Sequence, residues 1–157
     1  MGILTDNTFR ISQTAGALRI TPRQVVWLVK HIGDAFDHED ERRGWRRFSL
    51  FDICRLSLIR HLMEFGCAAG DAAQIALDIF DTRRLMAQFE KVPEGGLTSY
   101  FAHLVLIVER SNDRWTWHTG AVRAFDIAKT PDAFVLIKLG LIVADVEDGL
   151  AEWSEGD

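Results

Sequence analysis

The feature of the sequence that most constrains the fold is a helix-start signal, Thr21-Pro22, placed shortly after a short helical pattern. A threonine hydroxyl caps free backbone amides, and proline fits the first position of a helix. Before this signal, apolar residues recur at i, i+4 and i+7, which is one face of a helix: Ile11, Ala15 and Leu18. We therefore expect a short helix, a tight turn and a second helix that ends near His31.

The second helix offers two kinds of residue. Five apolar side chains are available for packing, namely Val25, Val26, Leu28, Val29 and Ile32. Its start and remaining positions carry polar, charged or aromatic side chains: Thr21, Arg23, Gln24, Trp27 and Lys30. In a helix-turn-helix unit the second helix enters the major groove of DNA, where Arg and Gln recognise guanine and adenine edges. Arg23 and Gln24 are equally ordinary solvent-facing residues, and Trp27 either packs on the sugar-phosphate backbone or fills the core.

Residues 33–48 have no helical periodicity and predict a hairpin, which we call the wing. An acidic segment at 37–41 is expected to form its solvated tip, and Gly44–Phe48 alternates as a strand does. Four arginines lie within six residues and surround a tryptophan: Arg42, Arg43, Trp45, Arg46 and Arg47. Such cations suit phosphate contacts whose strength falls with salt. The alternative is a solvated hairpin whose arginines are balanced by the acidic tip.

Ser49 opens the clearest helical pattern in the chain, which ends at Gly66. Ser49-x-x-Asp52 is a variant capping box, and glycine is common just after a helix. A further helix is expected from Ala69 to Phe80, with a continuation through Leu85, Met86 and Phe89. Pro93-Glu94-Gly95-Gly96 then predicts a domain boundary.

After this boundary the pattern changes. Residues 101–109 are rich in β-formers, Asn112-Asp113 predicts a two-residue turn, and residues 115–119 predict the returning strand. This register pairs Arg110 with Trp115 and Val108 with Trp117. A third strand is expected at 133–139, followed by a helix at 141–153.

Charge is distributed unevenly along the chain. The net charge is −5, but residues 1–66 carry ten Lys/Arg against eight Asp/Glu, and residues 67–157 carry eight against fifteen. The first part is therefore the better candidate for an anionic partner. Cys54 and Cys67 lie in apolar helical context and are expected to pack rather than form a disulfide. The sequence has no secretory signal pattern and no membrane-span pattern, so we expect a cytoplasmic protein.

The first half of the chain resembles the DNA-binding domain of the MerR family. That family has a short helix, a Ser/Thr-Pro-Arg start of the recognition helix, a wing ending in an Arg/aromatic strand, and an Ile-Arg-x-Leu-x-x-x-Gly helix. The matching segments are Thr21-Pro22-Arg23, Gly44-Trp45-Arg46-Arg47-Phe48-Ser49 and Ile59-Arg60-His61-Leu62-Met63-Glu64-Phe65-Gly66. The resemblance covers residues 9–80 and implies a winged helix that binds DNA. It does not extend to residues 97–157, so the family's metal- or drug-sensing mechanism is not implied.

We therefore expect an α+β protein with a winged helix-turn-helix domain over residues 9–90. A small α/β domain over 97–157 would hold a β-hairpin, a third strand and a C-terminal helix. The expected function is transcriptional regulation by sequence-specific binding to double-stranded DNA. One helix and one wing cover few base pairs, so a homodimer is expected, with the second domain serving dimerisation or an unknown effector or protein partner. The expected DNA-binding residues are Thr21, Arg23, Gln24, Trp27, Lys30, Arg42, Arg43, Trp45, Arg46 and Arg47.

Two alternatives remain open at this stage. The acidic total charge, and Val26-Trp27-Leu28 where the MerR family usually has Arg-Tyr-Tyr, favour a protein-interaction module on a winged-helix scaffold. An excisionase-like architectural DNA binder would use the same fold without a sensor domain. We expect no metal or cofactor, because no close Cys/His pair at ligand spacing occurs among His31, His38, Cys54 and Cys67. We expect no enzyme activity, because His103 and His118 share one side of the proposed hairpin without lying opposite each other, as partly buried sheet residues commonly do.

Overall fold

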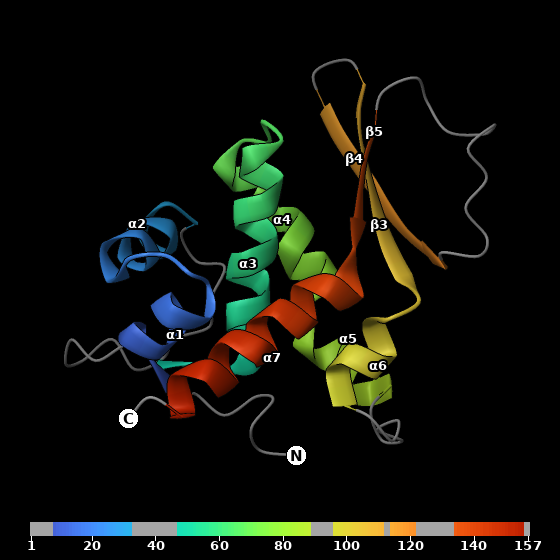
Figure 1. The fold of residues 1–157 in the computed structure, drawn as a ribbon. Helices are drawn as coiled ribbons and strands as arrows, with labels where there is room; N and C mark the ends of the chain where they lie inside the picture. The colour runs from blue at the N-terminus through green and yellow to red at the C-terminus, as the bar shows by residue number, and fades with distance from the viewer. Residues whose placement is uncertain (1–7, 33–46, 89–95, 112–113, 122–133, 156–157) are drawn as a thin grey trace. The chain divides into compact units, whose positions relative to one another are not determined.

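The computed structural model describes residues 8–32, 47–88, 96–111, 114–121 and 134–155, which form a mixed α+β protein with small antiparallel sheets (Figure 1). The helices are α1 (Ile11–Ala17), α2 (Pro22–Ile32), α3 (Leu50–Glu64), α4 (Ala69–Ile79), α5 (Thr82–Gln88), α6 (Gly96–Phe101) and α7 (Leu139–Glu155). The strands are β1 (Phe9–Arg10), β2 (Arg47–Phe48), β3 (Leu104–Ser111), β4 (Arg114–Ala121) and β5 (Phe134–Lys138). No helix in these segments is long and apolar enough to cross a membrane.

The chain divides into two compact units. Unit 1 consists of Met1–Ala87 and Asp145–Asp157, and unit 2 consists of Gln88–Ala144. The sequence predicted a second domain over 97–157, whereas the last part of that range clusters with unit 1. The reason is α7, which begins in unit 2 and ends in unit 1.

Among the described helices of unit 1, α3 supplies the largest share of buried apolar side chains. Its fully buried side chains come from several sides of the helix, and they include Phe51, Ile53, Leu56, Leu58, Ile59 and Leu62. A helix that is apolar over most of its circumference is enclosed by other elements. Phe65, the C-cap residue of α3, is 57% exposed. The predicted helix from Ala69 to Phe80 is α4, whose buried residues include Ala72, Ile75, Ala76 and Ile79.

The ends of α1 and α3 have the same backbone motif but different residues at its left-handed position. After α3, Gly66 has φ +87°, and the Cys67 amide donates to the Leu62 carbonyl. After α1, Arg19 has φ 51°, and the Ile20 amide donates to the Ala15 carbonyl. Both are Schellman motifs, for which glycine is the residue without a steric cost.

Replacing Arg19 with glycine is therefore expected to stabilise the protein by about 1 kcal/mol in urea unfolding. Arg19 also lies 3.7 Å from Glu152, but both side chains are about 70% exposed, so this ion pair contributes little. Arg19→Ala is the matched control, because it loses the same ion pair and keeps the steric cost. Equal stabilities of the glycine and alanine variants would contradict the backbone explanation.

Helix α7 packs closely on α1 inside unit 1. A Cβ atom added to Gly149 would lie 2.7 Å from both Cα and the carbonyl oxygen of Ala17. One turn further along α7, a Cβ atom added to Gly16 would lie 2.7 Å from Cδ1 of the Trp153 indole ring. Close helix contact at this place therefore depends on a glycine on each helix.

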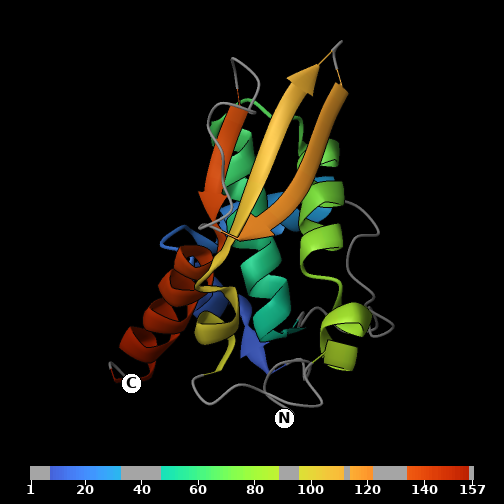
Figure 2. The same ribbon diagram turned by 90° about the vertical axis from the view of Figure 1, so that its right-hand side faces the viewer.

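Unit 2 contains a three-stranded antiparallel sheet with β3 between β4 and β5 (Figure 2). The predicted register of the hairpin is confirmed, since Arg110 pairs with Trp115 and Val108 pairs with Trp117. The predicted third strand is β5, which pairs with β3. Phe101, predicted to start the first strand, instead ends α6 and is buried. Its apolar character reflected burial in a short helix rather than a strand.

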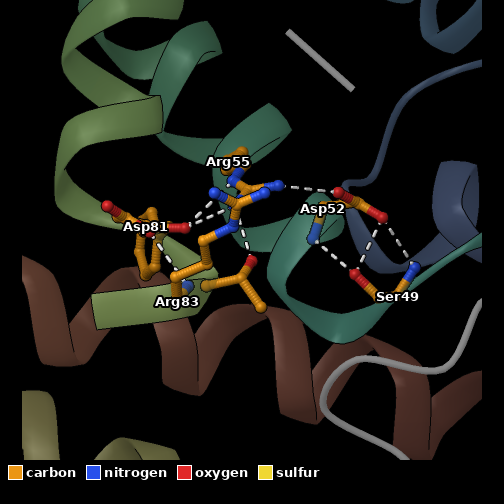
Figure 3. A network of polar contacts seen from close by, with 7 residues as sticks. Ser49, Asp52, Arg55, Asp81 and Arg83 are labelled. Carbon is orange, nitrogen blue, oxygen red and sulfur yellow. Dashed lines mark hydrogen bonds and ion pairs between the residues drawn. The ribbon is translucent and has the colours of Figure 1, made fainter. Parts of the chain in front are cut away.

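A buried polar network fixes the start of α3 to the connection between α4 and α5 (Figure 3). The predicted capping box is present: the Asp52 carboxylate accepts from the amide and hydroxyl of Ser49, and the Ser49 hydroxyl accepts from the Asp52 amide. Arg55 donates to Asp52 at 3.0 Å, to the carbonyl oxygen of Phe80, and to the Thr82 hydroxyl at 2.8 Å. Thus one guanidinium connects three segments of unit 1.

Cys54 and Cys67 are free and buried, as expected. Burial, with a smaller contribution from Asp71, raises the pKa of Cys67 from an ordinary value of 9.0 to about 11. Burial, with Glu147 acting in the same direction, raises the pKa of Cys54 further. Both thiols are therefore protonated in the folded state at pH values where an unfolded chain would ionise them.

Because the unfolded state loses these protons first, stability is expected to fall as pH rises above about 9. Each buried thiol contributes a slope of at most about 1.4 kcal/mol per pH unit, which needs complete ionisation in the unfolded chain only, and the contribution of Cys67 levels off above about pH 11. Urea unfolding at several pH values between 9 and 11 measures the slope. Cys54→Ala removes one of the two thiols and is expected to make the fall of unfolding free energy with pH less steep. An unchanged slope would contradict the explanation by buried thiols.

Candidate nucleic-acid interface

Helix α2 has one buried face and one exposed face. The buried face consists of Val25, Leu28, Val29 and Ile32, at the i, i+3, i+4, i+7 spacing of an amphipathic helix. The other residues from Thr21 to His31 are exposed. Val26, predicted to pack, is 52% exposed because it lies outside this apolar row. The exposed face is therefore free to meet a partner along most of the helix.

Thr21 and Gln24 form a reciprocal cap at the start of α2. The Gln24 side-chain oxygen accepts from the Thr21 amide at 2.8 Å and from the Thr21 hydroxyl at 3.0 Å. The Gln24 amide in turn donates to the Thr21 hydroxyl at 3.3 Å. A bidentate contact of Gln24 with adenine needs both the oxygen and the nitrogen of its side chain. In this structure the oxygen is engaged by Thr21, so the Thr21–Gln24 pair caps the start of α2.

Arg23 and Lys30 are the two cations on the exposed face of α2. They are seven residues apart, which places them about two helical turns from one another on the same side. Neither forms an ion pair with any residue that the structure describes. Both charges are thus available to an anionic partner.

Trp27 is 46% exposed, so it does not fill the core. Its indole ring stacks on the His31 ring, with centroids 4.2 Å apart and an interplanar angle of 25°. The Nδ1 atom of His31 lies 2.8 Å from the carbonyl oxygen of Trp27, which can only accept, so Nδ1 donates. These two contacts hold the indole at one place on the helix surface.

Most of the predicted wing, including Arg42, Arg43, Trp45 and Arg46, lies outside the described residues. Arg47 is described: it is exposed and belongs to β2, which pairs with β1. Its cross-strand partner is Arg10, also exposed, and neither guanidinium forms an ion pair with a described residue. Like charges directly opposite one another are unfavourable in a sheet unless an anion lies between them.

No sequence pattern indicates Arg10, because a two-residue strand has no periodicity. The pairing of Phe9 with Phe48 brings it into place, since burial of Phe48 fixes the register that puts Arg10 opposite Arg47. Arg60, from the segment that resembles the MerR family, faces the turn between α1 and α2 instead. Its guanidinium donates to the carbonyl oxygen of Leu18 and supports that turn.

No group of three or more His, Cys, Asp or Glu residues suited to a metal ion occurs within the described segments. His118 is exposed on β4, opposite Ile107 in the sheet. His103 precedes β3 and is exposed as well. The exposed surface of α2 and the paired arginines of β1 and β2 are therefore the candidate site. No protein-family model matches the sequence, and no curated protein is significantly similar to it.

Proposed function

We propose that this protein is a cytoplasmic, DNA-binding transcriptional regulator of the winged helix-turn-helix type. The observation that carries the proposal is the exposed face of α2, which presents Arg23 and Lys30, neither of them in an ion pair with a described residue. The capped start of α2 and the tight turn after α1 are typical of a recognition helix that follows a supporting helix. The Arg-rich wing would then hold the flanking phosphates.

Arg10 and Arg47 extend the proposed contact surface. Because they are cross-strand partners, their Cβ atoms lie about 4.5 to 5.5 Å apart, so both side chains leave the sheet from the same place. A phosphate group between them would offset their mutual repulsion. We assign both to phosphate contact, which positions the protein on DNA without recognising sequence.

We also propose that the protein acts as a homodimer on two half-sites, since one recognition helix covers few base pairs. The alternative function is a protein-interaction module. The exposure of Val26 and Trp27 favours it, because apolar side chains on one surface are common in protein interfaces.

Equilibrium binding to a random-sequence duplex at low salt tests the proposal. Arg23→Ala, Lys30→Ala and Arg47→Ala are each expected to weaken binding about 3- to 10-fold, because each removes one salt-dependent phosphate contact or base contact. Arg84→Ala, which removes an exposed cation on α5, is the matched control and should bind as the wild type does. Failure of the wild type to bind any duplex would favour the protein-interaction module.

A further inference from the structure

The exposed face of α2 has an apolar centre with a cation on each side. Val26 and Trp27 are 52% and 46% exposed. Arg23 precedes them by three and four residues, and Lys30 follows them by four and three, so all four lie on one side of the helix. A partner that matches this surface is anionic at its edges and apolar at one or two points between them.

We propose that Val26 and Trp27 contact thymine methyl groups in the major groove, so that the protein prefers sites with thymine at one or two positions. This inference rests on the DNA-binding function proposed above. On the floor of the major groove, the apolar group that distinguishes one base from the others is the C5-methyl of thymine. Val26 has no hydrogen-bonding side-chain atom, and the indole of Trp27 is apolar apart from its one N–H donor, so apolar contact is the recognition chemistry that the two side chains share.

Trp27 is held ready for such a contact before DNA binds. The hydrogen bond from His31 to the Trp27 carbonyl fixes the His31 ring, and the indole stacks on that ring. The rotation of the Trp27 side chain is thereby restricted. A side chain that is already ordered loses less conformational entropy on binding. His31 is thus a positioning residue for Trp27 rather than a contact of its own.

The test begins with selection of bound duplexes from a random pool by the wild-type protein. The tightest duplex is then made with deoxyuridine in place of thymidine, one position at a time. Deoxyuridine pairs with adenine in the same way and lacks only the methyl group. At one or two positions the wild type is expected to lose affinity about 3- to 10-fold. In Trp27→Ala or Val26→Ala this loss should disappear at the position that the missing side chain contacts.

Phe65→Ala is the matched control, because it removes an apolar side chain of 57% exposure from the end of α3 and leaves α2 intact. This variant should keep the full methyl effect. Equal affinity of the wild type for every thymidine and deoxyuridine duplex would overturn the thymine inference and leave the DNA-binding function standing. A methyl effect that survives in both α2 variants would overturn the assignment to these residues. Recovery of no duplex at all would contradict the proposed function itself.

Discussion

Arg55→Ala is expected to destabilise the protein by about 3 to 5 kcal/mol. The side chains of Arg55 and Asp52 are only 11% and 8% exposed, so removal of the guanidinium leaves the Asp52 carboxylate buried with no compensating charge. The variant also leaves the carbonyl oxygen of Phe80 and the hydroxyl of Thr82 without the donor that they have in the wild type. Urea unfolding followed by circular dichroism measures the loss.

Two further variants distinguish the cost of leaving the Asp52 charge unpaired from the cost of shortening an arginine side chain. Arg83→Ala changes an exposed arginine of the neighbouring helix and should alter stability by no more than about 0.5 kcal/mol. In the double variant Asp52→Ala/Arg55→Ala, the loss should be smaller than the sum of the two single losses, because no unpaired charge remains. A loss below about 1 kcal/mol for Arg55→Ala would contradict the network as described.

Gly149→Ala is expected to destabilise the protein by about 1 to 3 kcal/mol, although alanine favours helices more than glycine does. The added Cβ would lie 2.7 Å from backbone atoms of Ala17, and backbone cannot move aside as a flexible side chain can. α7 would have to separate from α1 to accept it. Thermal unfolding of the two proteins under identical conditions gives the difference.

Gly70→Ala is the same chemical change, but it is expected to stabilise the protein rather than destabilise it. Gly70 is also in a helix, but a Cβ there would meet no atom within 4 Å. This variant should stabilise the protein by up to about 1 kcal/mol through helix propensity alone. A stabilising effect of Gly149→Ala as well would show that α1 and α7 are not packed as closely as the structure has them.

Local signals in the sequence predicted the parts of the fold that local chemistry determines. Thr21-Pro22 marks the start of α2, Ser49-x-x-Asp52 forms the predicted capping box, and Gly66 follows α3 with positive φ. The Asn112-Asp113 turn predicted the hairpin register correctly, because a two-residue turn leaves only one way to pair the flanking strands. In each case the interacting residues are near one another in the chain.

The sequence patterns did not predict contacts between residues that are far apart in the chain. Nothing near Arg55 predicts its bonds to Phe80 and Thr82, and nothing near Gly149 predicts Ala17 as its neighbour. At the candidate site, the engagement of Gln24 could have been foreseen. Thr-x-x-Gln is a capping-box pattern, in which the glutamine side-chain oxygen bonds to the helix start.

In the proposed function, the cations of α2, β1 and β2 bind the phosphates of duplex DNA. The salt dependence of binding to a random duplex is the sharpest test, because each phosphate contact adds about 0.9 to the slope of log K against log salt. We expect a wild-type slope of about −4 or steeper, and a slope shallower by about 1 in Arg47→Ala and in Arg10→Ala. A wild-type slope near zero, or unchanged slopes in both variants, would contradict the claim.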